Sequence, residues 1–295
     1  MELLRMIESI RSPFLDILIG LITRLGEEEL ILVVVCAIFW SISKQFAYKA
    51  GMVFFLSSIT VQGGKIAFRI ERPWVIDPGF NPVPSAMARA TGYSFPSGHT
   101  QAAAALFGSL GAEFKKVLLK VICFSIVFLV AFSRMYLGLH TLLDVATSVA
   151  FTLLMVFIVF RLFRDDIPGE RLVLGSAIFI ILYAAASIIY AGILFSNGII
   201  EEVYLIDCGK SAGAAIGFAV GMLIETRFIN FSISSRSIPF HILKFVLGFA
   251  GVMAIKEGMK LIVGVSLATD IIRYFLMILW IFALYPLIIK RFFED

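Results

Sequence analysis

Long apolar stretches separated by short polar turns run through almost the whole chain. An α-helix needs about 17–25 mostly apolar residues to cross a bilayer. Because lipid cannot satisfy the edges of an open sheet, helices are the expected spanning elements. The pattern predicts an all-α, polytopic membrane helical bundle. Its expected spans, the first and third of them short, lie at residues 28–43, 46–68, 99–114, 117–136, 140–162, 171–195, 205–226, 240–262 and 269–290.

The first 25 residues show a different pattern. Apolar residues recur at helical spacing (Leu3, Leu4, Ile7 and Ile10), but charged residues interrupt them, so no cleavable signal peptide is indicated. This stretch predicts either an interfacial amphipathic helix or a short first span, and both readings stay open.

Composition agrees with a membrane protein. Hydrophobic residues make up 60% of the chain and charged residues 16%. The net charge of +4 is small and indicates loop asymmetry, not a nucleic-acid-binding face. Cys36, Cys123 and Cys208 lie far apart in apolar runs, which predicts buried free thiols and no disulfide or metal site.

Basic residues gather in alternate turns between the expected spans. With the spans above, the positive-inside rule makes this face cytoplasmic and places the C-terminus there. The opposite, non-cytoplasmic face receives three polar islands, at 65–73, 96–99 and 133–144. The basic positions are the turns 44–49, 113–120, 161–171 and 226–240 and the C-terminus.

The islands carry charges at the ends of membrane helices, where unpaired charge is costly and usually functional. Lys65, Arg72 and Arg134 can neutralise the oxygens of a phosphate, with the Arg side chains giving planar two-point contacts. Lys65 and Arg72 lie seven residues apart and share a helix face if the helix persists between them. Pro73 would then end that helix.

The second island is Pro96-Ser97-Gly98-His99, where a new apolar stretch begins. A helix N-terminus offers free N–H groups to an anion, Gly98 allows close approach, and Ser97 can donate its hydroxyl. His99 can protonate a leaving oxygen as a general acid. For this tetrapeptide alone, an ordinary N-cap beside an interfacial histidine is the better explanation.

The third island contains His140 and Asp144, four residues apart, so their side chains can meet. A carboxylate that accepts one ring N–H fixes the imidazole tautomer and leaves the other nitrogen as a nucleophile. The alternative is a pair that only stabilises the start of a helix. That alternative does not explain why all three polar islands occur in this order along the chain.

Taken together, the islands resemble the three signatures of the type 2 phosphatidic acid phosphatase family, which shares its site with vanadium haloperoxidases. The resemblance covers residues 28–162 and implies a core of about six helices, with about four further C-terminal transmembrane helices outside it. It implies that His140 is the nucleophile, Asp144 orients it and His99 is the acid, without metal or cofactor. The implied phosphate-binding residues are Lys65, Arg72, Ser97, Gly98 and Arg134. Softer similarities point to sphingosine-phosphate phosphatases and glucose-6-phosphatase.

The sequence therefore predicts an N-terminal amphipathic or short membrane helix at 1–27, a catalytic core at 28–165 and a transmembrane extension at 166–295. The polar connection 72–95 is expected to be a lid or a substrate-facing segment, with a merely solvated loop as the alternative.

We expect an integral protein of a bacterial cell membrane that hydrolyses a lipid or isoprenoid phosphate, monoester or diphosphate, at the non-cytoplasmic face. Its expected partners are this substrate and membrane lipids, with no nucleic acid, and the sequence does not give the oligomeric state. The alternatives are a soluble sugar-phosphate phosphatase of the glucose-6-phosphatase type, a lipid-linked phosphotransferase and a non-enzymatic lipid transporter.

Overall fold

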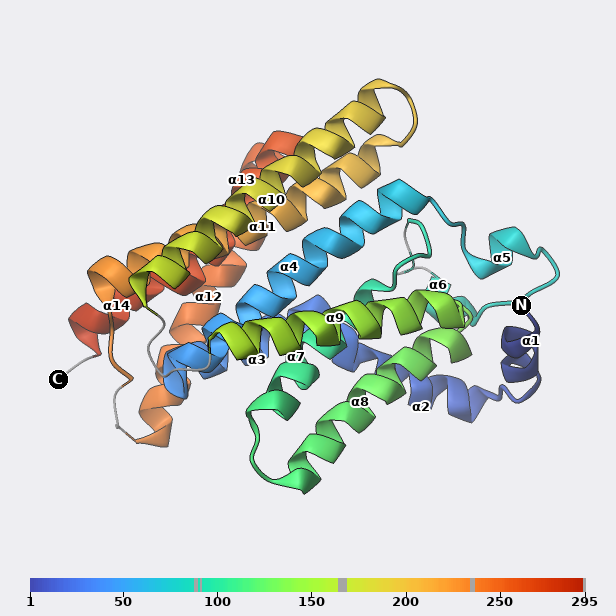
Figure 1. Cartoon of the computed structure of the whole chain (residues 1–295), viewed down its shortest axis with the longest axis horizontal. Coiled ribbons are helices and arrows are strands. Elements are labelled where there is room, and N and C mark those ends of the chain that lie inside the picture. The colour runs from blue at the N-terminus through green and yellow to red at the C-terminus, as the bar shows by residue number, and fades with distance from the viewer. Residues whose placement is uncertain (88–89, 91, 164–168, 234–236, 294–295) are drawn as a thin grey trace. The chain divides into compact units, whose positions relative to one another are not determined.

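The computed structural model describes residues 1–87, 90, 92–163, 169–233 and 237–293. Within these residues every regular element is a helix, so the predicted all-α membrane bundle is confirmed (Figure 1). The remaining residues include parts of the predicted 72–95 connection and of the basic turns 161–171 and 226–240, which therefore lie partly outside the described residues.

Seven helical segments in the described part are long and apolar enough to cross a membrane. The two short predicted spans form α3 (Glu28–Ser41) and α7 (Gly98–Glu113), with 14 and 16 residues. The seven candidates are Lys44–Ile76, Val117–Tyr136, Leu142–Leu162, Glu170–Ser196, Glu202–Ile229, Ile238–Val263 and Leu267–Phe292.

The chain divides into two compact units. Unit 1 contains Met1–Leu32 and Thr60–Leu162, and unit 2 contains Val33–Ile59 and Phe163–Asp295. The long helix α4 (Lys44–Phe68) contributes residues to both. All three polar islands fall in unit 1.

The N-terminal part of unit 1 is two helices, α1 (Glu2–Ser9) and α2 (Pro13–Thr23), where one helix was predicted. The physical reason is local. Ser12 is extended and its hydroxyl accepts the Leu15 N–H, while Pro13 occupies the first helical position, so the chain starts a new helix there. Neither helix is among the candidate spans. Both pack against α8 (Val117–Tyr136).

The connection after α4 contains two short helices, α5 (Pro73–Ile76) and α6 (Pro84–Met87). Its 77–83 stretch is fixed at several points. Arg5 of α1 forms an ion pair of 2.7 Å with Asp77, and the Val83 N–H donates to the Leu137 carbonyl at 3.0 Å. This stretch is therefore held by the unit and is not a merely solvated loop.

Helix α7 has to return the chain across the membrane despite its length. Arg72, which follows α4, touches His140, which lies between α8 and α9 (Leu142–Leu162). Those two points can meet only if the chain crosses both in α7 and in α8. A 16-residue helix is about 24 Å long. The contact therefore supports α7 as a short span.

Unit 2 contains α10 (Glu170–Ser196), α11 (Glu202–Ile224), α12 (Ile238–Val263), α13 (Leu267–Leu279) and α14 (Tyr285–Phe292). Two π-helices, η2 (Glu225–Ile229) and η3 (Trp280–Leu284), follow α11 and α13. Helix α11 packs along α10 and α13 (Figure 1).

Glycines at every fourth position of α11 allow this close packing. A Cβ added to Gly213 would lie 2.4 Å from the carbonyl oxygen of Ile271, and one on Gly217 would lie 2.5 Å from that of Phe275. Small residues at such spacing let membrane helices approach to backbone contact. The four glycines are Gly209, Gly213, Gly217 and Gly221.

Candidate active site

His140 lies in the tight turn between α8 and α9. Gly138 adopts φ +78°, a left-handed conformation that ends α8, and the Leu139 N–H donates to the Arg134 carbonyl at 3.0 Å. This turn buries the imidazole, which is 2% exposed. His140 therefore precedes α9 and is not on the same helix as Asp144. The two side chains still lie close together.

Asp144 lies in the first turn of α9, where it forms a reciprocal cap with Thr141. Its Oδ2 accepts the Thr141 N–H at 2.7 Å, and its own N–H donates to the Thr141 hydroxyl at 3.4 Å. The same Oδ2 lies 3.5 Å from Nδ1 of His140. The Asp144 carboxylate thus caps the start of α9 and also faces the His140 imidazole.

Arg72 completes the environment of His140. Its guanidinium nitrogen NH1 lies 3.0 Å from Nε2 of His140. Because a guanidinium only donates hydrogen bonds, Nε2 must accept. The ring proton is therefore assigned to Nδ1, on the side of Asp144, and the lone pair to Nε2.

The helix that carries Lys65 does not persist to Arg72, so these two residues do not share a helix face. Helix α4 ends at Phe68, and Arg69 takes the left-handed φ of 49°. Pro73 begins α5 and does not end α4. The turn brings Arg72 inward, where its Nε donates to the Gly92 carbonyl and its NH1 to the Leu139 carbonyl, both at 2.9 Å.

Arg134 lies in the last turn of α8, 4% exposed. Its NH1 donates to the Thr23 hydroxyl at 2.9 Å. Its Nε is buried, and among the described residues it has no hydrogen-bond partner. A buried donor without a partner costs free energy, so this nitrogen is suited to an anionic oxygen.

The second island forms the start of α7. Ser97 is the buried N-cap residue; its hydroxyl pairs with Thr100 at 3.0 Å and makes no side-chain cap bond. Gly98 is the first helical residue and has open space where a Cβ would stand. The Ser97 N–H donates to the Asp144 carbonyl at 3.4 Å, which ties this island to the third.

The remaining two predicted residues, His99 and Lys65, lie close enough to His140 for an electrostatic interaction. Burial lowers the pKa of the His99 imidazole, at the start of α7, well below its ordinary value, and the positive charges of Arg134, Lys65 and Arg72 lower it further. Lys65 lies in the last turn of α4, and its charge acts on His99 and His140. The structure therefore gathers all eight predicted residues in unit 1.

Burial lowers the pKa of the His140 imidazole well below its ordinary value, and the positive charges of Arg72, Arg134 and Lys65 lower it further. A charged imidazolium beside three cations and without solvent is unfavourable. His140 is therefore neutral at neutral pH, which is the state that a nucleophile requires.

Sequence reasoning missed three residues of this region. Ser94 donates its hydroxyl to Asp144 Oδ2 at 2.6 Å. Thr23 binds Arg134, and Gly26 packs so closely that a Cβ there would lie 2.5 Å from the His99 carbonyl oxygen. Ser94 stands two residues before Pro96, so its proximity to the second island was a usable signal. The local sequence pattern around residues 23–26 contains no signal that would have identified Thr23 or Gly26.

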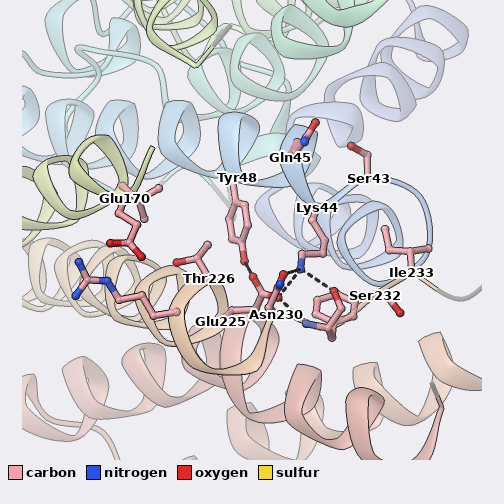
Figure 2. A pocket seen from close by; sticks show the side chains of 13 residues that line it. Ser43, Lys44, Gln45, Tyr48, Glu170, Glu225, Thr226, Asn230, Ser232 and Ile233 are labelled. Carbon is pink, nitrogen blue, oxygen red and sulfur yellow. Dashed lines mark hydrogen bonds and ion pairs between the residues drawn. The ribbon is translucent and has the colours of Figure 1, made fainter. Parts of the chain in front are cut away.

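A second polar region lies in unit 2, where a cavity of about 630 Å³ opens beside the start of α4 (Figure 2). The fully buried Glu225 carboxylate accepts from Lys44 Nζ at 2.6 Å, from the Phe231 N–H at 3.1 Å and from the Tyr48 hydroxyl. Lys44 also donates to the Asn230 side chain and the Phe231 carbonyl. These groups satisfy one another and anchor the η2 turn.

None of the predicted site residues lines that cavity. In the part of the chain that the structure describes, no group of three or more His, Cys, Asp or Glu side chains could hold a metal ion. The contacts of Arg72 with His140 and of Ser97 with Asp144 join the three polar islands, which form the candidate active site.

Two family models match this chain. The PAP2 superfamily model matches residues 46–168, and the model described as PAP2 superfamily phosphatase, transmembrane extension, matches residues 209–293. A search of curated proteins and a search of solved structures found no match. The chain belongs to the PAP2 superfamily, and it is an integral membrane phosphatase with a transmembrane extension.

Proposed function

We propose that this protein hydrolyses a lipid or isoprenoid phosphate through a phosphohistidine on His140. The observation that carries the proposal is the arrangement around this imidazole. Arg72 donates to Nε2 at 3.0 Å, and Asp144 Oδ2 lies 3.5 Å from Nδ1. One ring nitrogen thus faces a phosphate-binding cation and the other a carboxylate, as nucleophilic attack on phosphorus requires.

In the first step Nε2 of His140 attacks phosphorus, a bond between nitrogen and phosphorus forms, and the bond to the leaving oxygen breaks. The negative charge of the bound phosphate offsets the burial and the cations that lower the pKa of His99, so His99 is protonated in the complex and gives its proton to that oxygen. An alcohol leaves from a monoester, and an isoprenyl phosphate leaves from a diphosphate. The developing imidazolium keeps its Nδ1 proton toward Asp144. In the second step water attacks phosphorus, His99 takes the proton of that water, and the phosphate is released from Nε2.

Arg72 has to exchange partners when substrate binds. Its NH1 leaves Nε2 and donates to a phosphate oxygen, which opens the lone pair for attack. Arg134 Nε, which has no described partner, would donate to a second oxygen. Lys65, Ser97 and Gly98 would bind the remaining charge, since anions are stabilised by cations and by N–H groups at helix N-termini.

Apolar side chains beside Arg72 favour a lipid substrate over a sugar phosphate. Val75 and Ile76 of α5 are each 53% exposed, and Phe68 at the end of α4 is 63% exposed. Exposed apolar residues next to a phosphate-binding arginine suit a lipid tail better than a sugar. A phosphotransferase would use the same phosphohistidine with an alcohol acceptor in place of water.

We place the site at the non-cytoplasmic face of a bacterial cell membrane, with the C-terminus in the cytoplasm. The basic turns at 44–49 and 113–120 support this orientation through the positive-inside rule. A cysteine introduced at residue 82 should react with an impermeant thiol reagent in intact cells. Protection at residue 82 with labelling of Lys116→Cys would reverse the orientation.

The activity is tested with detergent-purified protein and a panel of a lysolipid phosphate, an isoprenyl diphosphate and glucose 6-phosphate, with EDTA present. We expect phosphate release from the lipid substrates that vanadate blocks and that His140→Ala abolishes. His241→Ala is the matched control, because His241 lies in α12 of unit 2. Full turnover by His140→Ala would exclude the mechanism, and a preference for glucose 6-phosphate would exclude the substrate class.

A further inference from the structure

Ser94 lies at the centre of the contacts that join Asp144 to His140. Its side chain is fully buried. Its Oγ donates to Asp144 Oδ2 at 2.6 Å and lies 3.5 Å from Nδ1 of His140. Its own N–H donates to the Ile70 carbonyl at 2.8 Å, so the segment between α4 and α5 holds the residue in place.

The direct link between the carboxylate and the imidazole is long. Asp144 Oδ2 and His140 Nδ1 are 3.5 Å apart, beyond the usual 2.7–3.2 Å of an N–H···O hydrogen bond. The two short bonds of Oδ2 come from Ser94 and from the Thr141 N–H. These bonds aim Oδ2, and the carboxylate depends on them for its orientation.

The proton positions determine which hydrogen bonds the Ser94 hydroxyl donates and which it can accept. Arg72 donates to Nε2, so the imidazole proton sits on Nδ1. The single hydroxyl proton of Ser94 points at the carboxylate, which leaves an oxygen lone pair for the Nδ1–H. Ser94 Oγ and Asp144 Oδ2 both lie 3.5 Å from Nδ1, so a chain from Nδ1–H to Oγ–H to Oδ2 closes only when the imidazole moves toward them.

We propose that Ser94 is a positioning residue that couples Asp144 to His140 during phosphoryl transfer. It holds Oδ2 and shares the Nδ1 proton as the ring becomes cationic, when such hydrogen bonds shorten. The proposal rests on the proposed function, because it requires His140 to be phosphorylated. It adds a residue outside the eight that the islands contain.

The test is a double-mutant cycle on the rate constant for phosphohistidine formation, measured by alkali-stopped single turnovers with a ³²P-labelled lysolipid phosphate. Ser94→Ala should slow the step about tenfold with little change in the substrate concentration at half saturation. The Ser94→Ala/Asp144→Asn double variant should be no slower than Asp144→Asn alone. Ser109→Ala is the control, since Ser109 is a fully buried serine of α7 outside the site.

Additive effects of Ser94→Ala and Asp144→Asn, or a wild-type rate in Ser94→Ala, would overturn the role of Ser94. If Ser109→Ala slowed the step as much as Ser94→Ala, the effect of Ser94 would be one of general packing and not of positioning Asp144. Failure of the wild-type protein to form phosphohistidine would instead overturn the proposed function.

Discussion

The guanidinium of Arg72 donates its 3.0 Å hydrogen bond to Nε2 of His140, the nitrogen that carries the lone pair. In the proposed mechanism, the cation that binds phosphate therefore covers the nucleophile until substrate arrives. It also keeps the imidazole neutral and fixes its tautomer. Binding of the substrate phosphate and exposure of the nucleophile are then a single event.

Replacing Arg72 tests this dual role. Arg72→Lys keeps the charge but loses the planar contacts to His140 and to the Leu139 and Gly92 carbonyls. We expect kcat/KM to fall about 10- to 100-fold, the size of a charge-assisted hydrogen bond. Arg69→Lys is the control, because the Arg69 side chain is exposed and donates to the Ile66 carbonyl, away from His140. Equal activity of the two variants would show that Arg72 acts as a point charge alone.

Replacing Gly26 tests whether the N-terminal segment helps to position the catalytic groups. A Cβ in Gly26→Ala would meet the His99 carbonyl oxygen at 2.5 Å and Val130 at 2.9 Å, so the start of α7 has to move. We expect kcat to fall about tenfold or more, because small displacements of catalytic groups are costly. Gly20→Ala in α2 meets nothing within 4 Å and should retain activity. A wild-type kcat in Gly26→Ala would show that residues 23–27 do not position the catalytic groups.

The close packing of α11 on α13 predicts a stability effect without a catalytic one. In Gly213→Ala the new methyl group would lie 2.4 Å from the Ile271 carbonyl oxygen, which is backbone and has little freedom to move. We expect a loss of about 1–3 kcal/mol in the free energy of unfolding, measured as a lower thermal midpoint in detergent. Gly192→Ala in α10 has open space and should be neutral or stabilising. Equal midpoints would contradict the backbone contact.

The lowered pKa of His140 predicts how stability depends on pH. The unfolded chain binds a proton at this residue below about pH 6.5, whereas the folded protein, whose pKa is lower, does not. The unfolded state therefore gains protons as pH falls through this window, and the fold loses stability by up to about 1.4 kcal/mol per pH unit from this group. Above about pH 6.5 the contribution is fully present.

Thermal midpoints of wild type and His140→Gln between pH 7.5 and 5.5 check this prediction. Glutamine does not titrate, so the midpoint of the variant should fall less steeply than that of the wild type. Parallel curves would mean that His140 is not held neutral by its surroundings.

The sequence predicted the helices well because lipid imposes a strict length and hydropathy on each span. It failed where local backbone chemistry decides the outcome. Ser12-Pro13 starts a new helix inside an otherwise helical pattern, a signal of N-cap and first-turn proline that the apolar periodicity concealed. The left-handed Arg69 keeps α4 from reaching Arg72, without glycine or proline at that position.

The meeting of His140 and Asp144 could be anticipated because they stand four residues apart in the same island. Contacts between distant segments could not. Thr23 reaches Arg134 across 111 residues, and Ser94 reaches Asp144 across 50. Such partners are ordinary hydroxyl residues, whose function depends on the position that the fold gives them and not on a local pattern.

The most direct measurement is the identity of the phosphorylated residue. The protein is mixed with a lysolipid phosphate, stopped within milliseconds in alkali, digested and sequenced by mass spectrometry. We predict phosphate on His140 in wild type and in His241→Ala, and none in His140→Ala, which should also release no phosphate. Phosphate on another side chain, or steady turnover in His140→Ala, would contradict the central claim that Nε2 of His140 is the nucleophile.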